Sequence, residues 1–158
     1  MTREKKSWKE KLADDKGLPR VETITDKLSP HWGAGTVVIP SPKEVDELMR
    51  KVPRGKVTTI NIIRETLAKR HHATIGCPIT TGIFAWIAAN AAAEDAAAGA
   101  ASITPYWRTL KSKGVINEKY PGGGVAQKKI LDEEGLAVIK KDEKYIVVDY
   151  EKNLFSFE

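Results

Sequence analysis

The residues best suited to nucleophilic chemistry are the sole cysteine, Cys77, and two histidines, His71 and His72, which precede it by six and five positions. A thiol just before Pro78, where we expect a helix to begin, can have a lowered pKa, and a nearby histidine can accept its proton. A buried, unreactive cysteine is the common alternative. These residues would supply only three zinc ligands at an unfamiliar spacing, so we predict no metal site and no cofactor.

Phosphate binding is a second chemistry that the residue types allow. We expect it from the basic side chains of Lys56 and Arg64 and from the backbone amides of Thr58 and Thr59 at a helix start. Solvated surface charge is the alternative for each basic residue. The run Gly122–Gly124 could approach an anion, but it lacks the lysine and serine that end a phosphate-binding loop. A flexible helix entry explains this run more simply.

Composition and charge limit the class of protein. The chain has 158 residues, 41% of them hydrophobic, and a net charge of +5, which fits one domain with arms and is compatible with nucleic-acid binding. The apolar run 83–101 is interrupted by Asn90, Glu94 and Asp95, so we predict no membrane span and no membrane partner. The charged N-terminus lacks the apolar core of a secretory signal. A single cysteine agrees with a reducing compartment, and we predict a cytoplasmic protein.

The first part of the chain, residues 1–40, is predicted to be a basic arm that ends in a short extended segment. Its first twenty residues are rich in charge and poor in apolar side chains, which favours disorder or a loosely docked helix. Residues 31–40 contain the β-favouring run Thr36–Ile39, which we expect to pack against the domain.

Three helices are predicted in residues 41–98. Ser41 and Glu44 form a capping-box pattern, with Pro42 at the first helical position of a helix that ends near Lys51. Thr58 or Thr59 caps the next helix, which continues to about Arg70. The third runs from about residue 80 to residue 98, where Gly99 ends it. Its second half is almost entirely alanine, so we expect that end to project into solvent or fray.

The C-terminal part combines one helix with a hairpin. Gly122–Gly124 leads into a helix with Ala126, Ile130 and Leu131 inward and Gly135 at its end. Residues 136–139 and 145–148 are β-rich, and residues 140–144 form the loop between them. The predicted fold class is α+β: a winged-helix-like helical domain that contains a helix-turn-helix and carries a C-terminal β-hairpin.

Four segments, in order, resemble the DNA-binding domain of the O6-alkylguanine-DNA alkyltransferases. They are GKVTTINIIRETL, TTGIFAWIAANA, PYWRTL and YPGGGVAQKKILDEEG, and the resemblance covers residues 41–135. It implies a winged-helix DNA-binding domain over residues 41–135, with residues 136–158 as a hairpin extension of the same domain.

The resemblance also implies a site that has lost its reaction. In that family the motif at the position of PYWR is PCHR. Its cysteine attacks the alkyl carbon of a damaged guanine, and its histidine takes the proton of the cysteine through water. A glutamate orients the histidine. Here the matching residues are Tyr106, Trp107 and Glu134, while Arg108 matches the arginine and Tyr120 a tyrosine that lines the pocket. A phenol, with a pKa of about 10, is a poorer nucleophile than a thiolate. The chain is therefore not expected to be an enzyme.

Some family members, the alkyltransferase-like proteins, lack the cysteine, bind damaged guanine and signal to other repair machinery. They usually keep the histidine, often in the motif PWHR, whereas this chain carries PYWR. Tyr106 and Trp107 could stack on a flipped base or fill the former pocket. The family's recognition-helix arginine aligns with Thr81, a tyrosine that helps rotate a phosphate aligns with Ile60, and two glycines align with Phe84 and Ala85.

We therefore predict a non-catalytic, monomeric protein that binds double-stranded DNA, recognises O6-alkylguanine lesions and works with repair proteins. The helix over residues 80–98 is expected to dock in the minor groove, and the DNA-contacting residues are Lys56, Thr58, Thr59, Arg64 and Thr81. Two alternatives stay open. One is methyl transfer to Cys77, and the other is a protein-interaction or small-molecule module without DNA binding, which Thr81, Ile60 and Phe84 favour.

Overall fold

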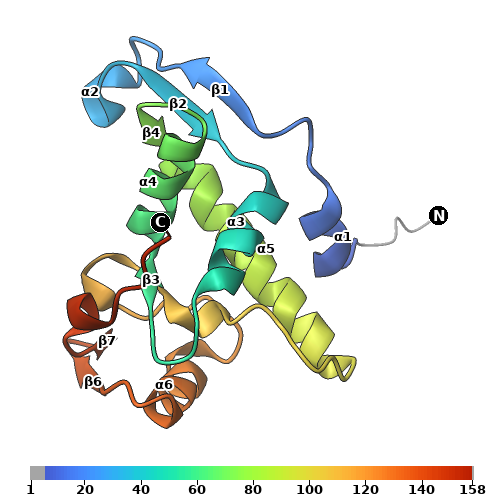
Figure 1. Ribbon diagram of the computed structural model, residues 1–158, viewed down its shortest axis with the longest axis vertical. Coiled ribbons are helices and arrows are strands. Elements are labelled where there is room, and N and C mark those ends of the chain that lie inside the picture. Colours follow the sequence, from blue (N-terminus) through green and yellow to red (C-terminus); the bar gives the residue numbers. More distant parts are fainter. Residues whose placement is uncertain (1–5, 158) are drawn as a thin grey trace.

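The computed structural model describes residues 6–157, so the first five residues of the predicted arm lie outside the described part of the chain. A long helix, α5 (Pro78–Ala97), packs against α3 (Pro42–Lys51), α4 (Ile60–Arg70) and α1 (Trp8–Ala13), as Figure 1 shows. With its small sheets the chain has a mixed α+β fold, which confirms the predicted fold class.

The predicted arm takes part in a three-stranded sheet. Strand β1 (Arg20–Thr23) pairs antiparallel with β2 (Thr36–Ile39), and β2 pairs parallel with β4 (Ile75–Gly76), which lies between α4 and α5 in the sequence. The short helix α2 (Ser29–Trp32) lies between β1 and β2. The extended segment at Thr36–Ile39 was predicted, but β1 was not, because all four of its residues are exposed and give no apolar pattern. Residues 20–39 are thus built into the folded body.

Helix α3 begins and ends as the capping signals indicate. The Ser41 side chain accepts the amide of Glu44, and Pro42 is the first helical residue. The second half of the predicted capping box is wrong, because the Glu44 carboxylate instead binds Arg70 of α4 and His71, the residue that follows α4 as its C-cap. That interaction ties α3 to α4. Thr59 caps α4 by accepting the amide of Ile62, and α4 ends at Arg70 as predicted.

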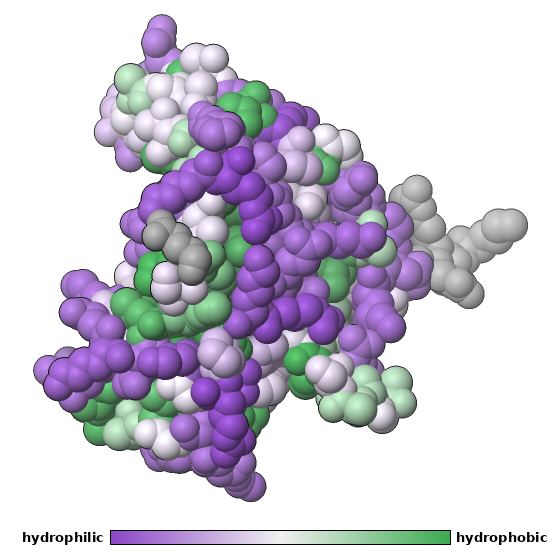
Figure 2. All heavy atoms as spheres, in the orientation of Figure 1, coloured by the Kyte–Doolittle hydropathy of each residue, from purple (hydrophilic) through white to green (hydrophobic). Residues whose placement is uncertain are grey.

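Helix α5 starts two residues earlier than predicted. Cys77 is its N-cap, with the sulfur accepting the Thr80 amide at 3.5 Å, and Pro78 is the first helical residue. Ala98 ends the helix, followed by Gly99 at a positive φ of 85°. Ala91 and Ala92 are buried, whereas residues 96–100 are exposed. This end projects from the body in Figure 1 and forms the pale green lobe at lower right in Figure 2.

The second half of the chain is held by short strands and turns. Strand β3 (Thr58–Thr59) pairs parallel with β5 (Thr109–Leu110), directly after the 3-10 helix η1 (Tyr106–Arg108). The 3-10 helix η2 (Ser112–Gly114), α6 (Gly123–Glu133), the hairpin β6 (Val138–Lys141) and β7 (Lys144–Val147), and η3 (Tyr150–Asn153) follow.

Two details of this half differ from the prediction. The hairpin loop has two residues rather than five, because Asp142 and Glu143 adopt positive φ angles of 49° and 66° that close a tight turn. In α6, Leu131 is fully buried but Ala126 and Ile130 are only half-buried, and Gln127 is buried instead. The Gln127 amide donates to the carbonyl oxygens of Asn117 and Gly123.

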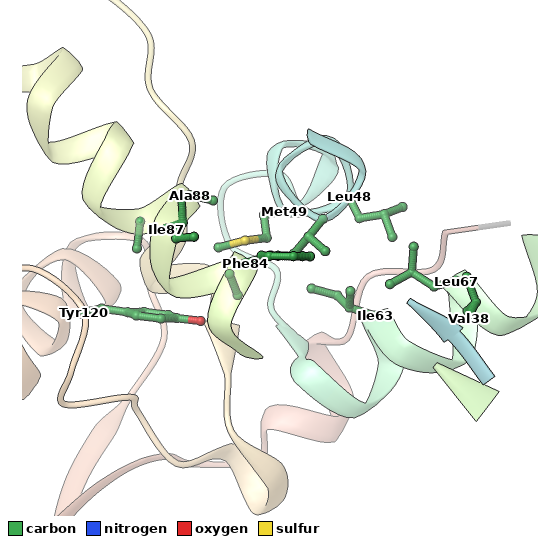
Figure 3. Packing of buried hydrophobic residues seen from close by; sticks show 12 residues of the cluster. Val38, Leu48, Met49, Ile63, Leu67, Phe84, Ile87, Ala88 and Tyr120 are labelled. Carbon is green, nitrogen blue, oxygen red and sulfur yellow. The ribbon is translucent and has the colours of Figure 1, made fainter. Parts of the chain in front are cut away.

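The largest hydrophobic core lies among α3, α4, α5 and β2. Figure 3 shows Phe84 of α5 facing Met49 of α3 and Ile63 of α4, with Tyr120 on the side of α5 that carries Ile87. A second cluster joins α6 to the hairpin and consists of Val57, Leu110, Ile116, Leu131, Leu136, Val138 and Val147. A third cluster joins Cys77 to β2 and consists of Ile24, Val37 and Cys77. The cores fix η1 and the loop before α6 against α5.

Candidate functional site

Glu134, at the C-terminal end of α6, is the centre of the hydrogen-bond network around η1. Its side chain is 2% exposed. The Arg108 guanidinium donates from Nε to Oε1 and from Nη2 to Oε2, both at 2.9 Å, and the Gly55 amide donates to Oε1 at 3.3 Å. Burial opposes ionisation of this carboxyl, but the hydrogen bonds from Arg108, Trp107 and Gly55 outweigh burial, so the pKa of Glu134 is lowered.

Trp107 completes this network through its ring nitrogen. The Trp107 indole Nε1 donates to Glu134 Oε2 at 2.7 Å, and the Arg108 guanidinium lies over the indole ring at 5.5 Å from its centroid. An indole N–H is a donor only, whereas an imidazole has a second nitrogen that can accept a proton. Trp107 can therefore hold Glu134 in place but cannot relay a proton.

Contacts at both ends of the 105–108 segment fix η1 against α3. Before it, the Thr104 hydroxyl donates to Asp46 Oδ1 at 2.6 Å, and after it, Arg108 Nη1 donates to the Val52 carbonyl at 2.9 Å. Asp46 also accepts from Arg50 at 2.8 Å, so both of its carboxylate oxygens are bonded. The 105–108 segment is thus held between α3 and α6.

Tyr106 and Tyr120 face each other beside this network. Their ring centroids are 6.0 Å apart in an edge arrangement, and Tyr106 makes a similar contact with Trp107 at 5.2 Å. Tyr120 is 3% exposed, whereas Tyr106 is half-buried and its hydroxyl donates to the Pro121 carbonyl at 3.4 Å. Burial raises the pKa of both phenols, so neither gives a phenolate at neutral pH. The three aromatic rings pack on one another.

Four of the five residues predicted to contact DNA have buried or half-buried side chains, although the prediction for Thr58 and Thr59 concerned their backbone amides. The side chains of Thr58, Thr59 and Thr81 are buried, and Thr59 is occupied in capping α4, so these hydroxyls do not reach the surface. Arg64 is half-buried and donates to the Gly76 carbonyl and to Asn61, which joins α4 to β4. Lys56 is exposed in the turn before β3.

Cys77 and the two histidines are not brought together as a nucleophile and base. Cys77 is 5% exposed and caps α5, while His71 binds Glu44. Within residues 6–157 no group of three or more His, Cys, Asp or Glu residues is arranged to hold a metal ion. Nor does the described part of the chain contain a helix long and apolar enough to cross a membrane.

The sequence prediction missed an open hollow on the outer side of α5. It has a volume of about 660 Å³ and is lined by α5 and by the loop before α6, through Ile79, Gly82, Ile83, Trp86, Asn117 and Lys119. Residues 78–93 of α5 carry no charge and few polar groups, so no periodic pattern of polar residues indicates which face is outward. Only the packing of the helix identifies this face.

Helix α1 lies beside the same face. The Trp8 ring meets the Trp86 ring edge-on, with centroids 4.7 Å apart. The Glu94 carboxylate accepts the amides of Trp8 and Lys9, and Lys9 forms an ion pair with Asp95 at 3.0 Å. The docked helix that was one of two expectations for the arm is therefore present. Its half-buried Trp8 and Leu12 pack against the main core, although none of its residues is fully buried.

Comparison with known proteins gives the fold. No protein-family model matches this chain, and no curated protein matches it. A crystal structure of S. pombe ATL in complex with DNA is similar, with a TM-score of 0.53, 20% sequence identity, and coverage of 73% of this chain and 94% of that chain. A second structure, S. pombe Atl1 in complex with damaged DNA containing O6-carboxymethylguanine, has a TM-score of 0.48 and 19% identity over the same coverage. The chain shares the fold of S. pombe ATL.

Proposed function

We propose that this chain is a non-enzymatic member of the alkyltransferase-like branch, which binds double-stranded DNA as a monomer and recognises an altered guanine for repair. The observation that carries the proposal is the bond from the Trp107 indole to Glu134. The frame formed by Arg108 and Glu134 is intact, yet the position next to it holds a group that cannot accept a proton. A site that has the Arg108–Glu134 ion pair but no proton acceptor beside it fits recognition of a lesion better than catalysis.

Two further observations support the proposal. The fold is that of S. pombe ATL, whose crystal structure contains DNA. Cys77 is buried and occupied as a helix cap, which argues against methyl transfer to that thiol. A phenol held at the position of Tyr106, with its pKa raised by burial, is no replacement for a thiolate.

A salt-dependent titration tests DNA binding. Matched duplexes that contain guanine or O6-methylguanine at one position are compared over a range of salt concentrations. Binding through phosphates makes log affinity fall with log salt, with a slope of about −0.9 for each phosphate contacted. We expect binding to both duplexes, tighter for the lesion, and loss of that preference in Tyr106→Ala. Absence of binding at every salt concentration would reject the proposal and favour a module without DNA binding.

Intact-mass measurement tests the absence of catalysis. After incubation with alkylated DNA we expect no stoichiometric gain of one methyl group. A gain that disappears in Cys77→Ser would show methyl transfer to the thiol and overturn the non-enzymatic assignment, whatever the titration gives.

A further inference from the structure

Helix α5 has an unfavourable charge for a helix that is expected to lie against DNA. It contains two acidic residues, Glu94 and Asp95, and no lysine or arginine. Both acids follow Trp86 in the C-terminal half of the helix, about 12 Å further along its axis. A carboxylate that faces phosphates without a counter-charge weakens their binding, because like charges repel. The proposed function therefore requires that these two acids be compensated.

Helix α1 of the N-terminal arm covers both acids. The Glu94 carboxylate accepts the amides of Trp8 at 3.1 Å and of Lys9 at 2.9 Å. The Lys9 ammonium group lies 3.0 Å from the Asp95 carboxylate, and the Asp95 side chain is only 20% exposed. One turn of α1 thus supplies a donor or a cation to each acid of α5.

Packing holds α1 at the edge of the hollow on α5. Trp8 and Leu12 are half-buried against the main core, and the Trp8 ring meets the Trp86 ring edge-on with centroids 4.7 Å apart. Because Trp86 lines the hollow, α1 borders any ligand that lies there. The two acids that α1 covers are therefore close to the surface expected to meet DNA.

Other acidic residues in this region have compensating groups that do not depend on α5. Those of the arm are occupied within the arm: Glu10 by the Ser7 amide, Asp14 by Lys6, and Asp15 by the Gly17 amide. A neighbouring hollow, which shares Asn117 and Lys119 with that on α5, is lined by one acid and three lysines, Glu118, Lys111, Lys119 and Lys144. Glu94 and Asp95 differ in that they rely on α1.

We infer that α1 is a charge-compensating element of the DNA-binding surface, which pairs with Glu94 and Asp95 so that a duplex can lie along α5. The inference rests on the proposed function and gives the N-terminal arm a role in it. Helix α1 acts by cancelling repulsion and not by binding phosphates, since Lys9 is already paired. DNA binding should therefore depend on α1 only while Glu94 and Asp95 are charged.

A double-mutant cycle in the full chain tests the pairing of Lys9 with Asp95. Affinity for an unmodified duplex is measured at low ionic strength, where surface charges act over the longest range. Lys9→Gln leaves Asp95 unpaired and should weaken binding about fivefold. Lys9→Gln combined with Asp95→Asn should restore the wild-type affinity. Lys16→Gln is the matched control, because Lys16 is exposed in the turn after α1, and it should change the affinity by less than about twofold.

A second set of variants removes the packing of α1. Trp8→Ala combined with Leu12→Ala should undock α1, uncover both acids and weaken binding by roughly tenfold. Adding Glu94→Gln and Asp95→Asn to this variant should restore binding, although α1 stays undocked. Calorimetric melting of each variant checks that the fold is kept.

The outcomes separate charge compensation from other roles of α1. If Asp95→Asn fails to restore the affinity of Lys9→Gln, Lys9 contacts DNA directly and the compensating role is wrong. If the undocked variant binds more tightly than wild type, α1 obstructs the surface, and the role is again wrong. If Lys9→Gln binds as wild type does, the role is wrong and the proposed function stands. If wild type binds no duplex, the proposed function fails and the compensating role fails with it.

Discussion

At the scale of single residues, the geometry of the candidate site depends on the hydrogen bonds that Glu134 accepts. The carboxylate accepts from a guanidinium, an indole and a backbone amide, all within 3.3 Å. Each donor satisfies a lone pair of a group that is costly to bury unpaired. Tryptophan supplies the one N–H that the carboxylate needs and nothing that could pass a proton onward.

Removing the indole N–H, together with part of the ring system, should therefore destabilise the protein measurably. Trp107→Phe keeps an aromatic ring but leaves Glu134 with one donor fewer, and we expect the free energy of unfolding in urea to fall by about 1.5 kcal/mol. Tyr106→Phe is the control, because the Tyr106 hydroxyl makes only a 3.4 Å bond and should cost about 0.5 kcal/mol or less. Equal losses in the two variants would show that the Trp107–Glu134 bond is not special.

The lowered pKa of Glu134 gives the second prediction at this scale. A carboxyl whose pKa is lower in the folded than in the unfolded state stabilises the fold above the unfolded pKa of about 4.3, and this stabilisation is lost as the pH falls through the folded pKa. At pH 7, Glu134→Gln should lower the free energy of unfolding by roughly 3 kcal/mol.

Urea unfolding from neutral to acidic pH checks the sign. The difference between wild type and Glu134→Gln should stay constant above about pH 5 and shrink below about pH 4. A difference that grows on acidification would contradict the assigned direction of the pKa shift.

At the scale of elements, the approach of β4 to α4 depends on one glycine. A Cβ on Gly76 would lie 2.5 Å from the Arg64 carbonyl oxygen, and the same strand holds β2 in the sheet. Helix α4 and β4 are also joined by the Arg64 side chain, which donates to Gly76 at 3.0 Å. The turn between the two predicted helices is therefore a packed element and not a loose connection.

Two alanine substitutions at glycines should have opposite effects. Gly76→Ala forces a backbone clash and should lower the free energy of unfolding by about 2 kcal/mol or more. Gly82→Ala lies inside α5 with no atom within 4 Å of the new Cβ, and should stabilise by about 0.5 to 1 kcal/mol. Thermal unfolding of both variants checks this, and destabilisation by Gly82→Ala would mean that the outer face of α5 is covered.

The elements also show why sequence reasoning succeeded in some places and not in others. Ser41, Thr59 and Gly99 act within a few residues, so their types fixed the ends of three helices. Strand β1 is exposed along its whole length and pairs with a segment 16 residues later, which no local pattern records. The Trp107–Glu134 pair is separated by 27 positions, and the sequence placed both residues at the site only through resemblance.

At the scale of the whole molecule, the N-terminal arm divides into two parts with different roles. Helix α1 buries no residue, whereas the segment from β1 to β2 contributes Ile24, Val37 and Val38 to the buried cores. The cooperative unit should therefore include residues 20–39 and depend little on α1.

Two truncations test that division. A chain without residues 1–13 should melt cooperatively, within roughly 5 °C of wild type. A chain without residues 1–39 loses two of the three strands of the sheet and should show no cooperative transition by calorimetry. Cooperative melting of the shorter chain near the wild-type temperature would contradict this division. It would mean that the folding unit begins after residue 40, at the boundary predicted from the sequence.

The edge contact between Trp8 and Trp86 also makes the position of α1 visible by spectroscopy. Two indoles whose centroids are 4.7 Å apart and whose planes are 81° apart couple their electronic transitions, which should give an exciton couplet in the circular dichroism spectrum. The couplet should vanish in Trp8→Phe and should survive in Trp32→Phe. Because Trp86 also lines the hollow on α5, adding DNA and following the couplet reports, without any attached dye, whether the arm stays docked when the outer face of α5 is occupied.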